Sequence, residues 1–425
     1  MPGALTRGAD PHMQTGASPK IFYGWVVVWA GFVCMLVIFG TTYSFAAFFA
    51  SFASEFSAQR ADVAMVFGLS GLLYFVLGAP AGAIADRVGP RTTCTTGMVA
   101  LAAGLFAASF ADRLPLVYLA LGGGIGLGVA LVYTPAMGAV LPWFMRNRGL
   151  ASGIASSGIG AGTLVVPLAA AWLIGTLGWR DAMRVMAVGI AVLGISAAWL
   201  MEKNPARRGL GPDGGPPLDT SRSAGHSALA GMTLREVLAT RRFWWLYLST
   251  FACAPTMFTP FAHVSVHARD LGVPDGQSVA LVGLIGVGSL IGRFGIGAIA
   301  DRIGRLRTLV LMEALLIASY SLWWGAPGFA LLAVFAVSFG LFYGGLVSLL
   351  PPICMDLFGG RAVSGVIGVL YSAAAFGNLV GPVAAGAAFD RFGSYTPVML
   401  GCGVSSAIGL WAAWRVVRSK EAVAA

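Results

Sequence analysis

Residues 279–307, VALVGLIGVGSLIGRFGIGAIADRIGRLR, decide the fold class of this chain. They hold about one bilayer thickness of apolar residues, a single arginine (Arg293), and then a short basic loop. A guanidinium at that depth costs roughly 2.5–3.5 kcal/mol on insertion scales. Such residues almost always face the interior of a helix bundle and mark a functional path. The stretch therefore predicts a membrane span that carries a functional cation.

The composition extends this interpretation to the whole chain. Of the 425 residues, 57% are hydrophobic and 10% charged, whereas soluble domains have about 25% charged residues. The apolar runs do not alternate with polar residues, which excludes a membrane β-barrel. Twelve spans are predicted, at residues 23–50, 61–85, 92–110, 114–141, 149–175, 182–201, 243–266, 278–300, 306–324, 329–350, 362–388 and 397–417.

The spans and the polar stretches between them predict five regions. These are a disordered tail (1–22), a six-helix half (23–201), a Pro/Gly-rich linker (202–242) with a possible short helix at 233–240, a second six-helix half (243–417) and a tail (418–425). The side with both termini holds 20 of the 27 lysines and arginines, and the opposite side holds six. This bias predicts cytoplasmic termini. The net charge of +10 is thus an orientation signal rather than a nucleic-acid patch.

An internal repeat links the two halves. Residues 82–89 read GAIADRVG, and residues 297–304 read GAIADRIG, 215 positions later. The same shift places Pro167 on Pro382 and Gly78 on Arg293. Two parallel six-span halves with a site at the midplane are the plan of alternating-access carriers. Only one half therefore supplies the buried cation.

The repeated loop, G-x-x-x-D-R-x-G-x-R, resembles the signature of the major facilitator superfamily. The resemblance covers nearly the whole chain and implies the twelve-helix, all-α fold of that superfamily. It also implies a monomer in the plasma (inner) membrane, with gate contacts that stabilise the outward-open state. The gate residues would be Asp86, Arg87, Arg91, Asp301 and Arg302. The competing interpretation is a basic turn that only sets topology.

Within the superfamily, the chain looks most like the monocarboxylate and oxalate/formate carriers. Residues 23–28, YGWVVV, are similar to the start of their first span, and Arg293 matches the arginine of their eighth. The resemblance implies that Arg293 binds a small organic monocarboxylate anion, such as lactate or pyruvate. Proton symport is expected as well, although Ser289 and Tyr43 stand where the animal carriers have an aspartate and a lysine.

Further residues are expected to line the site. Arg293 and Tyr133 lie roughly 12 Å and 15 Å from the same side at 1.5 Å per residue, so they share a depth. Tyr371 and Asn378 share one helix face, His263 could titrate near the opposite end, and Phe342 could close an apolar wall. Ser289 and Tyr43 complete the set. Each of these has a purely structural interpretation as well. For Glu313, in the ninth span, a structural hydrogen bond is the favoured interpretation.

Several other functions compete with this interpretation. An anion exchanger of the oxalate/formate type is an alternative, although the exchangers that this chain resembles pair the arginine with a lysine in the eleventh span, which has no charge here. A larger organic acid remains a second candidate, and a non-transporting sensor is a remote one. The five cysteines are single residues in or near apolar runs, with no metal or disulfide spacing. No catalytic set or cofactor motif is visible, so we expect neither an enzyme nor a cofactor.

Overall fold

The computed structural model describes residues 22–145, 148–203, 205–215, 231–359 and 363–424. Within these ranges the backbone is helical, and the one β-bridge joins Gly231 to Gly359. Ten helical segments of the described residues are long and apolar enough to cross a membrane. Two further helices, α4 (Pro90–Ala108) and α12 (Arg241–Asp270), are long but less apolar. The described helices are therefore consistent with twelve spans.

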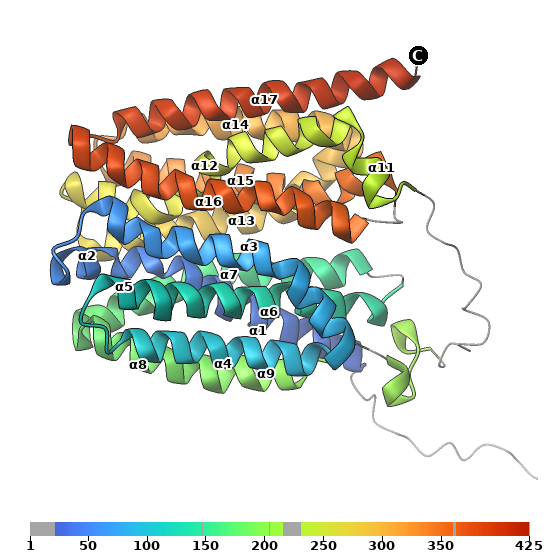
Figure 1. The fold of residues 1–425 in the computed structure, drawn as a ribbon, viewed down its shortest axis with the longest axis horizontal. Helices are drawn as coiled ribbons and strands as arrows, with labels where there is room; N and C mark the ends of the chain where they lie inside the picture. Colours follow the sequence, from blue (N-terminus) through green and yellow to red (C-terminus); the bar gives the residue numbers. More distant parts are fainter. Residues whose placement is uncertain (1–21, 146–147, 204, 216–230, 360–362, 425) are drawn as a thin grey trace, which may run out of the picture.

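The first group of helices forms the lower half of Figure 1. Its members are α1 (Tyr23–Tyr43), α2 (Phe45–Glu55), α3 (Arg60–Val88), α4, α5 (Leu114–Val117), α6 (Gly123–Val140), α7 (Arg148–Leu177), α8 (Trp179–Gly189) and α9 (Ile195–Trp199). Short π-helical turns connect α5 to α6 and α8 to α9. The first span is longer than predicted, because α2 continues α1 to Glu55. The two helices are separated by a break at Ser44, whose hydroxyl donates to the Thr41 carbonyl at 2.7 Å.

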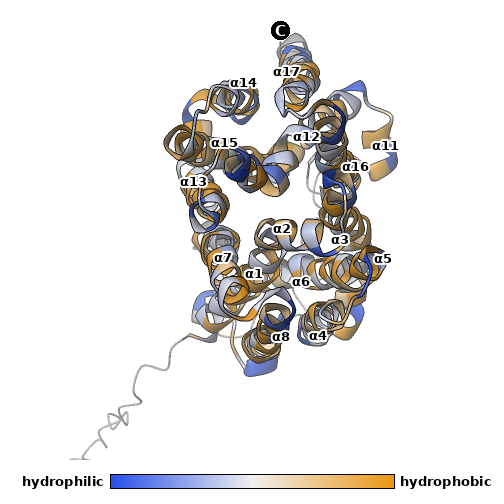
Figure 2. Ribbon diagram, turned by 90° about the vertical axis from the view of Figure 1, so that its left-hand side faces the viewer, coloured by the Kyte–Doolittle hydropathy of each residue, from blue (hydrophilic) through white to orange (hydrophobic). Residues whose placement is uncertain are grey.

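The second group lies above the first in Figure 1. It comprises α11 (Leu234–Leu238), α12, α13 (Asp275–Ile303), α14 (Arg305–Trp324), α15 (Phe329–Phe358), α16 (Val363–Phe392) and α17 (Thr396–Ala424). The short helix expected in the linker is confirmed as α11, which starts with a capping box between Thr233 and Glu236. Viewed along the helices, the two groups meet through α3 with α16 and through α7 with α13 (Figure 2).

The helix pair α13 and α15 packs through two facing Gly-x-x-x-Gly motifs. Gly288 and Gly292 lie on α13, and Gly340 and Gly344 lie on α15. A Cβ atom at any of these positions would collide with the backbone of the facing helix. Small residues let membrane helices approach closely and gain dispersion contacts. This packing fixes the rotation of α13 and, with it, the direction of Arg293.

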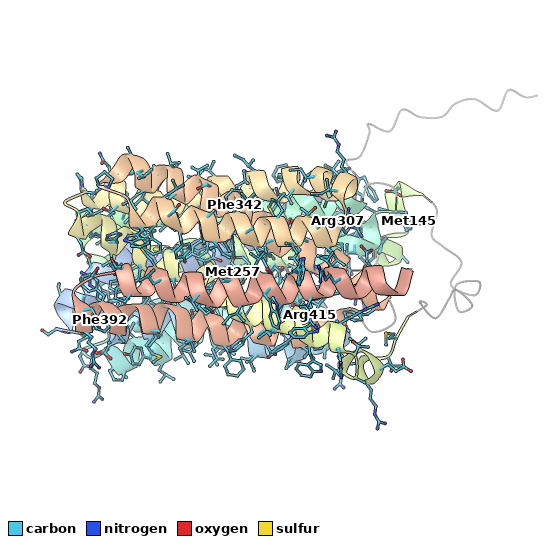
Figure 3. The ribbon with its side chains drawn as sticks, turned by 90° about the horizontal axis from the view of Figure 1, so that it is seen from above. Met145, Met257, Arg307, Phe342, Phe392 and Arg415 are labelled. Atoms are coloured by element: carbon cyan, nitrogen blue, oxygen red, sulfur yellow. The ribbon has the colours of Figure 1, made fainter. Side chains whose placement is uncertain are left out.

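The two ends of the bundle are distinct. Figure 3 places Met145 and Arg307 at one end of the bundle, here called the terminal end, where α17 also ends (Figure 1). Phe392 marks the opposite end, here called the distal end (Figure 3). Large apolar side chains such as Trp172 and Leu119 are exposed on the outer surface, as expected for a protein surrounded by lipid. The five cysteines are buried and unpaired.

Candidate functional site

Arg293 points toward the interior of the bundle, and the rest of α13 shows why. Gly292 faces α15, and Leu290 faces α7. Ile291 is 50% exposed and marks the lipid side. Because successive helical residues are rotated by about 100°, Ser289 and Arg293 project on the remaining, inner side. The expectation that this cation faces inward is thus supported by the packing of its neighbours.

The guanidinium of Arg293 has few partners among the described residues. Its Nε atom donates to the Ser289 hydroxyl at a long 3.4 Å, and the side chain is only partly buried. No carboxylate of the described residues lies within ion-pair distance of it. An arginine presents five N–H donors in a fork that fits a carboxylate. The arrangement can therefore accept an anion.

Phenol groups from both helix groups gather near this charge. The hydroxyls of Tyr43 on α1 and Tyr343 on α15 lie 3.3 Å apart, although 300 residues separate them. The positive charge of Arg293 interacts electrostatically with the phenols of Tyr43, Tyr343 and Tyr371. Tyr133 on α6 interacts electrostatically with Tyr343 and Tyr371. Of the expected site tyrosines, Tyr43 and Tyr371 therefore lie near Arg293, and Tyr133 lies near Tyr371.

Two members of this cluster, Tyr74 and Tyr343, were not predicted from the sequence as polar site residues. The phenol of Tyr74 on α3 interacts with those of Tyr133, Tyr343 and Tyr371. The repeat held a signal for Tyr74, because the 215-residue shift places it on Ser289. No such signal existed for Tyr343, whose repeat equivalent is Gly128.

Apolar rings surround the phenols. Tyr43 stacks on Phe261 of α12, with ring centroids 4.2 Å apart. Phe39 of α1 contacts Tyr133 at 5.6 Å, and Phe75 of α3 contacts Tyr371 at 5.9 Å. Phe342 is half-buried about midway along the bundle (Figure 3), on a different side of α15 from Tyr343. The site thus combines one cation with phenol donors and aromatic walls.

Asn378 and His263 have partners within the protein. The Asn378 amide nitrogen donates to the carbonyls of Phe67 and Gly68 on α3, at 3.3 and 3.4 Å, so it joins the two helix groups. His263 is fully buried between α12 and α16. Its Nε2 atom lies 2.8 Å from the Pro382 carbonyl, which can only accept, so Nε2 carries the proton and Nδ1 accepts from the Tyr395 hydroxyl at 3.0 Å.

The expected gate residues lie at the terminal end. Arg87 and Arg302 are exposed, and Arg91 is partly buried with no hydrogen-bond partner for its Nε atom among the described residues. The side chains of Asp86 and Asp301 lie outside the described residues. The gate role of this loop therefore stays a prediction.

A group of charged and polar side chains, here called the distal latch, joins the two helix groups at the distal end. Arg60, at the start of α3, donates from both terminal nitrogens to Asp270 of α12 at 2.7 Å. It also donates to the Tyr395 hydroxyl at 2.8 Å and lies 3.6 Å above the ring of Phe389. The backbone N–H groups of Arg60 and Ala61 donate to Asp390 of α16, which matches an anion to a helix N-terminus. The sequence offered no signal for this pairing.

Comparisons with known proteins identify the family of the chain. The sequence matches the family model described as Major Facilitator Superfamily over residues 31–329 and 268–425. It is 28% identical to monocarboxylate transporter 13 of Rattus norvegicus, over 88% of this chain and 84% of the relative. It is 29% identical to monocarboxylate transporter 11 of Homo sapiens, over 94% of this chain and 85% of the relative.

One solved structure shares the fold. It is the crystal structure of a bacterial homolog of the human lysosomal transporter Spinster, in an inward-facing and unoccupied conformation. The TM-score is 0.68, and the match covers 95% of this chain and 99% of that one. At 15% sequence identity, this likeness concerns the fold alone.

Proposed function

The chain belongs to the major facilitator superfamily as a multi-pass membrane transporter, and from this premise we propose that it carries small monocarboxylates such as lactate or pyruvate. Transport proceeds by alternating access, as two six-helix halves (residues 23–201 and 243–417) rock about a midplane site. The substrate moves together with a proton. The protein works as a monomer in the plasma (inner) membrane, with both termini in the cytoplasm, as the distribution of lysines and arginines favours.

The observation that carries this proposal is the state of Arg293. It is a permanent cation on the inner side of α13, its hydrogen bond to Ser289 among the described residues is long, and no described carboxylate neutralises it. A monocarboxylate supplies the one missing negative charge through a bidentate, charge-assisted contact. Ser289, one helical turn earlier on α13, orients the guanidinium by accepting a hydrogen bond from its Nε atom.

The remaining site residues complete the pocket around the substrate. Tyr43, Tyr133 and Tyr371 donate hydrogen bonds to its oxygens, while Asn378 and His263 keep the surrounding helices in place. Phe342 supports the apolar wall from α15. At the terminal end, Asp86, Arg87, Arg91, Asp301 and Arg302 form the gate that alternates with the distal latch.

The aromatic walls favour a second candidate, a larger organic acid. Phe39, Phe75 and Phe261 present rings beside the phenols, and an aromatic substrate would stack against such rings with a gain of about 0.5–1.5 kcal/mol. Uptake of benzoate in competition with lactate distinguishes the two. The exchanger alternative has no described second cation to support it.

The test is uptake of labelled lactate and pyruvate into proteoliposomes. Arg293→Gln is expected to abolish saturable uptake, because a neutral side chain cannot compensate the buried carboxylate. Arg184→Gln is the matched control: this arginine lies at the distal end, pairs with Asp181 at 2.7 Å within α8, and is expected to leave uptake unchanged. Normal saturable uptake by the Arg293 variant would refute the proposed function.

A further inference from the structure

Glu313 is a buried carboxyl that the proposed site does not use. It lies near the middle of α14 with 1% of its surface exposed, about 12 Å from the start of the helix at 1.5 Å per residue. Its Oε1 atom accepts a hydrogen bond from the Ser249 hydroxyl of α12, and the Cys253 thiol lies against the carboxyl. The Oε2 atom has no hydrogen-bond partner among the described residues. A buried intramembrane acid with one unpartnered oxygen points to a function.

No described cation compensates this carboxyl. Among the titratable groups of the surrounding helices, Cys253 is the one that interacts with it in the described part of the chain. The others have different partners: Arg415 of α17 lies over Trp245 and Trp411, Asp356 of α15 pairs with Arg305, Cys402 of α17 lies beside Thr259, and Arg293 of α13 contacts Ser289. An ionised carboxylate in a dry site without a cation is strongly disfavoured. The site therefore favours uptake of a proton.

A line of polar residues runs along α12 from this carboxyl to the distal end. We call it the polar stripe; its members are Ser249, Cys253, Thr256, His263, His267 and Asp270. Successive members are three, four or seven residues apart, so they share one helix face. The stripe contributes to the low hydropathy of α12. At its far end, Asp270 is part of the distal latch and is partly exposed.

The stripe is bonded to α14 and α17 along its length. The Ser406 hydroxyl of α17 donates to that of Thr256 at 2.5 Å. The Tyr320 hydroxyl of α14 donates to the Thr256 carbonyl at 2.7 Å, which Pro260 leaves without its helical N–H partner. The Trp323 indole of α14 donates to Nδ1 of His267 at 2.7 Å.

The opposite face of α12 contacts the substrate site and the first helix group. Phe261 stacks on Tyr43, and Phe258 contacts Phe75 with ring centroids 5.9 Å apart. Two prolines, Pro255 and Pro260, interrupt the backbone hydrogen bonds between these contacts and allow the helix to bend. One helix therefore connects the carboxyl of Glu313, the aromatic wall and the distal latch.

We propose that Glu313 is the proton-binding site that couples this carrier to a proton gradient, and that α12 transmits its protonation to the substrate site. This inference rests on the proposed function. On loading, the carboxylate of Glu313 takes one proton from water and becomes a neutral carboxylic acid, while Arg293 binds one monoanion. On release, the proton returns to water.

Charge balance explains why the two ligands travel together. When both are bound, Glu313 is neutral and the anion compensates Arg293. When both have left, the charges of Glu313 and Arg293 sum to zero. A carrier with one ligand alone holds a net charge of one inside the membrane, which is costly. Only the fully loaded and the empty forms therefore change their orientation readily.

The test separates coupling from transport. Proteoliposomes are assayed for exchange of labelled pyruvate at equal pH, for pyruvate accumulation driven by an inward proton gradient, and for internal acidification with an enclosed pH dye. Glu313→Gln keeps the shape and the hydrogen bond from Ser249. It is expected to retain exchange, to lose accumulation above the external concentration, and to lose pyruvate-dependent acidification. Glu55→Gln is the control, because that acid pairs with Arg180 at the distal end.

The outcomes are distinguishable. Gradient-driven accumulation by Glu313→Gln at the wild-type level overturns this inference and leaves the proposed function standing. Saturable uptake by Arg293→Gln removes the proposed function itself. If Glu313→Gln also lacks exchange, infrared spectroscopy on the wild type decides. A carbonyl band of a dry carboxylic acid that titrates with pH, and that shifts in Ser249→Ala, supports the inference; absence of this band overturns it.

Discussion

At the scale of single residues, Arg293 differs from an arginine with a structural role in how few of its N–H donors have partners within the protein. Arg293 is held by a 3.4 Å hydrogen bond to Ser289, whereas Arg60 at the distal end makes three short hydrogen bonds to two residues. A cation with satisfied donors stabilises the fold, and a cation with open donors is ready for a ligand. The phenols of Tyr43 and Tyr343 supply neutral donors beside it, which orient an anion without adding a second charge.

Tyr343→Phe tests the role of these phenols. The change keeps the ring packing but removes a hydroxyl near the proposed carboxylate position. We expect a loss of about 1 kcal/mol of binding free energy, or a roughly fivefold higher KM for lactate, with little change in maximal rate. The measurement is initial uptake against lactate concentration. Tyr118→Phe is the control, since its hydroxyl donates to the Asp62 carbonyl near the distal end. An unchanged KM for Tyr343→Phe would show that this hydroxyl does not contact substrate.

At the scale of helices, the pair α13 and α15 positions the site. The facing Gly-x-x-x-Gly motifs bring the two backbones into direct contact and leave no room for a side chain. Because Arg293 follows Gly292 directly, the packing that buries the glycine also turns the arginine inward. Helix α12 differs: it contains two prolines, which cannot donate backbone hydrogen bonds, and its polar stripe is hydrogen-bonded to neighbouring helices.

Gly292→Leu tests the close packing. A leucine there would push against the backbone of α15, and overpacking of this kind costs at least about 1–3 kcal/mol. We expect a clearly lower melting temperature and loss of the monodisperse peak in size-exclusion chromatography. Gly295→Leu, on the same helix, is the control, because a Cβ at Gly295 meets no atom within 4 Å. Equal stability of the two variants would contradict the role of this interface.

At the scale of the whole molecule, charged side chains join the two helix groups at the distal end. At the distal end, Arg60 of α3 pairs with Asp270 of α12, and Asp390 of α16 accepts from the start of α3. These contacts cross between the groups, so they must break before the distal end can open. The structure therefore represents a state with the distal end closed.

Arg60→Ala tests this latch. Hydrogen bonds to charged groups contribute about 1.5–3 kcal/mol each, so the population with an open distal end is expected to rise by about tenfold or more. The measurement is the rate at which a water-soluble maleimide labels Ser265→Cys, a buried position beside α2, with the native cysteines replaced. Arg180→Ala is the control, because Arg180 pairs with Glu55 inside the first helix group. Equal labelling rates in both variants would show that the latch does not hold this end closed.

The sequence by itself determined the membrane class, the positions of most spans, the repeat and the placement of Arg293 inside a span. These features are local: the bilayer disfavours charge and unpaired backbone groups at any position, so apolar length and charge placement can be read along the chain. The shared depth of Arg293 and Tyr133 is a prediction from helical rise alone. The family resemblance then named the major facilitator superfamily, which the family model confirms.

Only the tertiary structure decided which side chains meet. Tyr43 and Tyr343 are 300 residues apart, Arg60 and Asp270 are 210 apart, and Glu313 meets Ser249 across two different helices. Hydropathy does not predict such pairs, because an apolar helix face is nearly as favourable against lipid as against another helix. Which faces touch depends on close packing at glycines and on buried hydrogen bonds between helices. The cation was therefore predictable from the sequence, while the phenols around it, the latch and the surroundings of Glu313 were determined by how the helices pack.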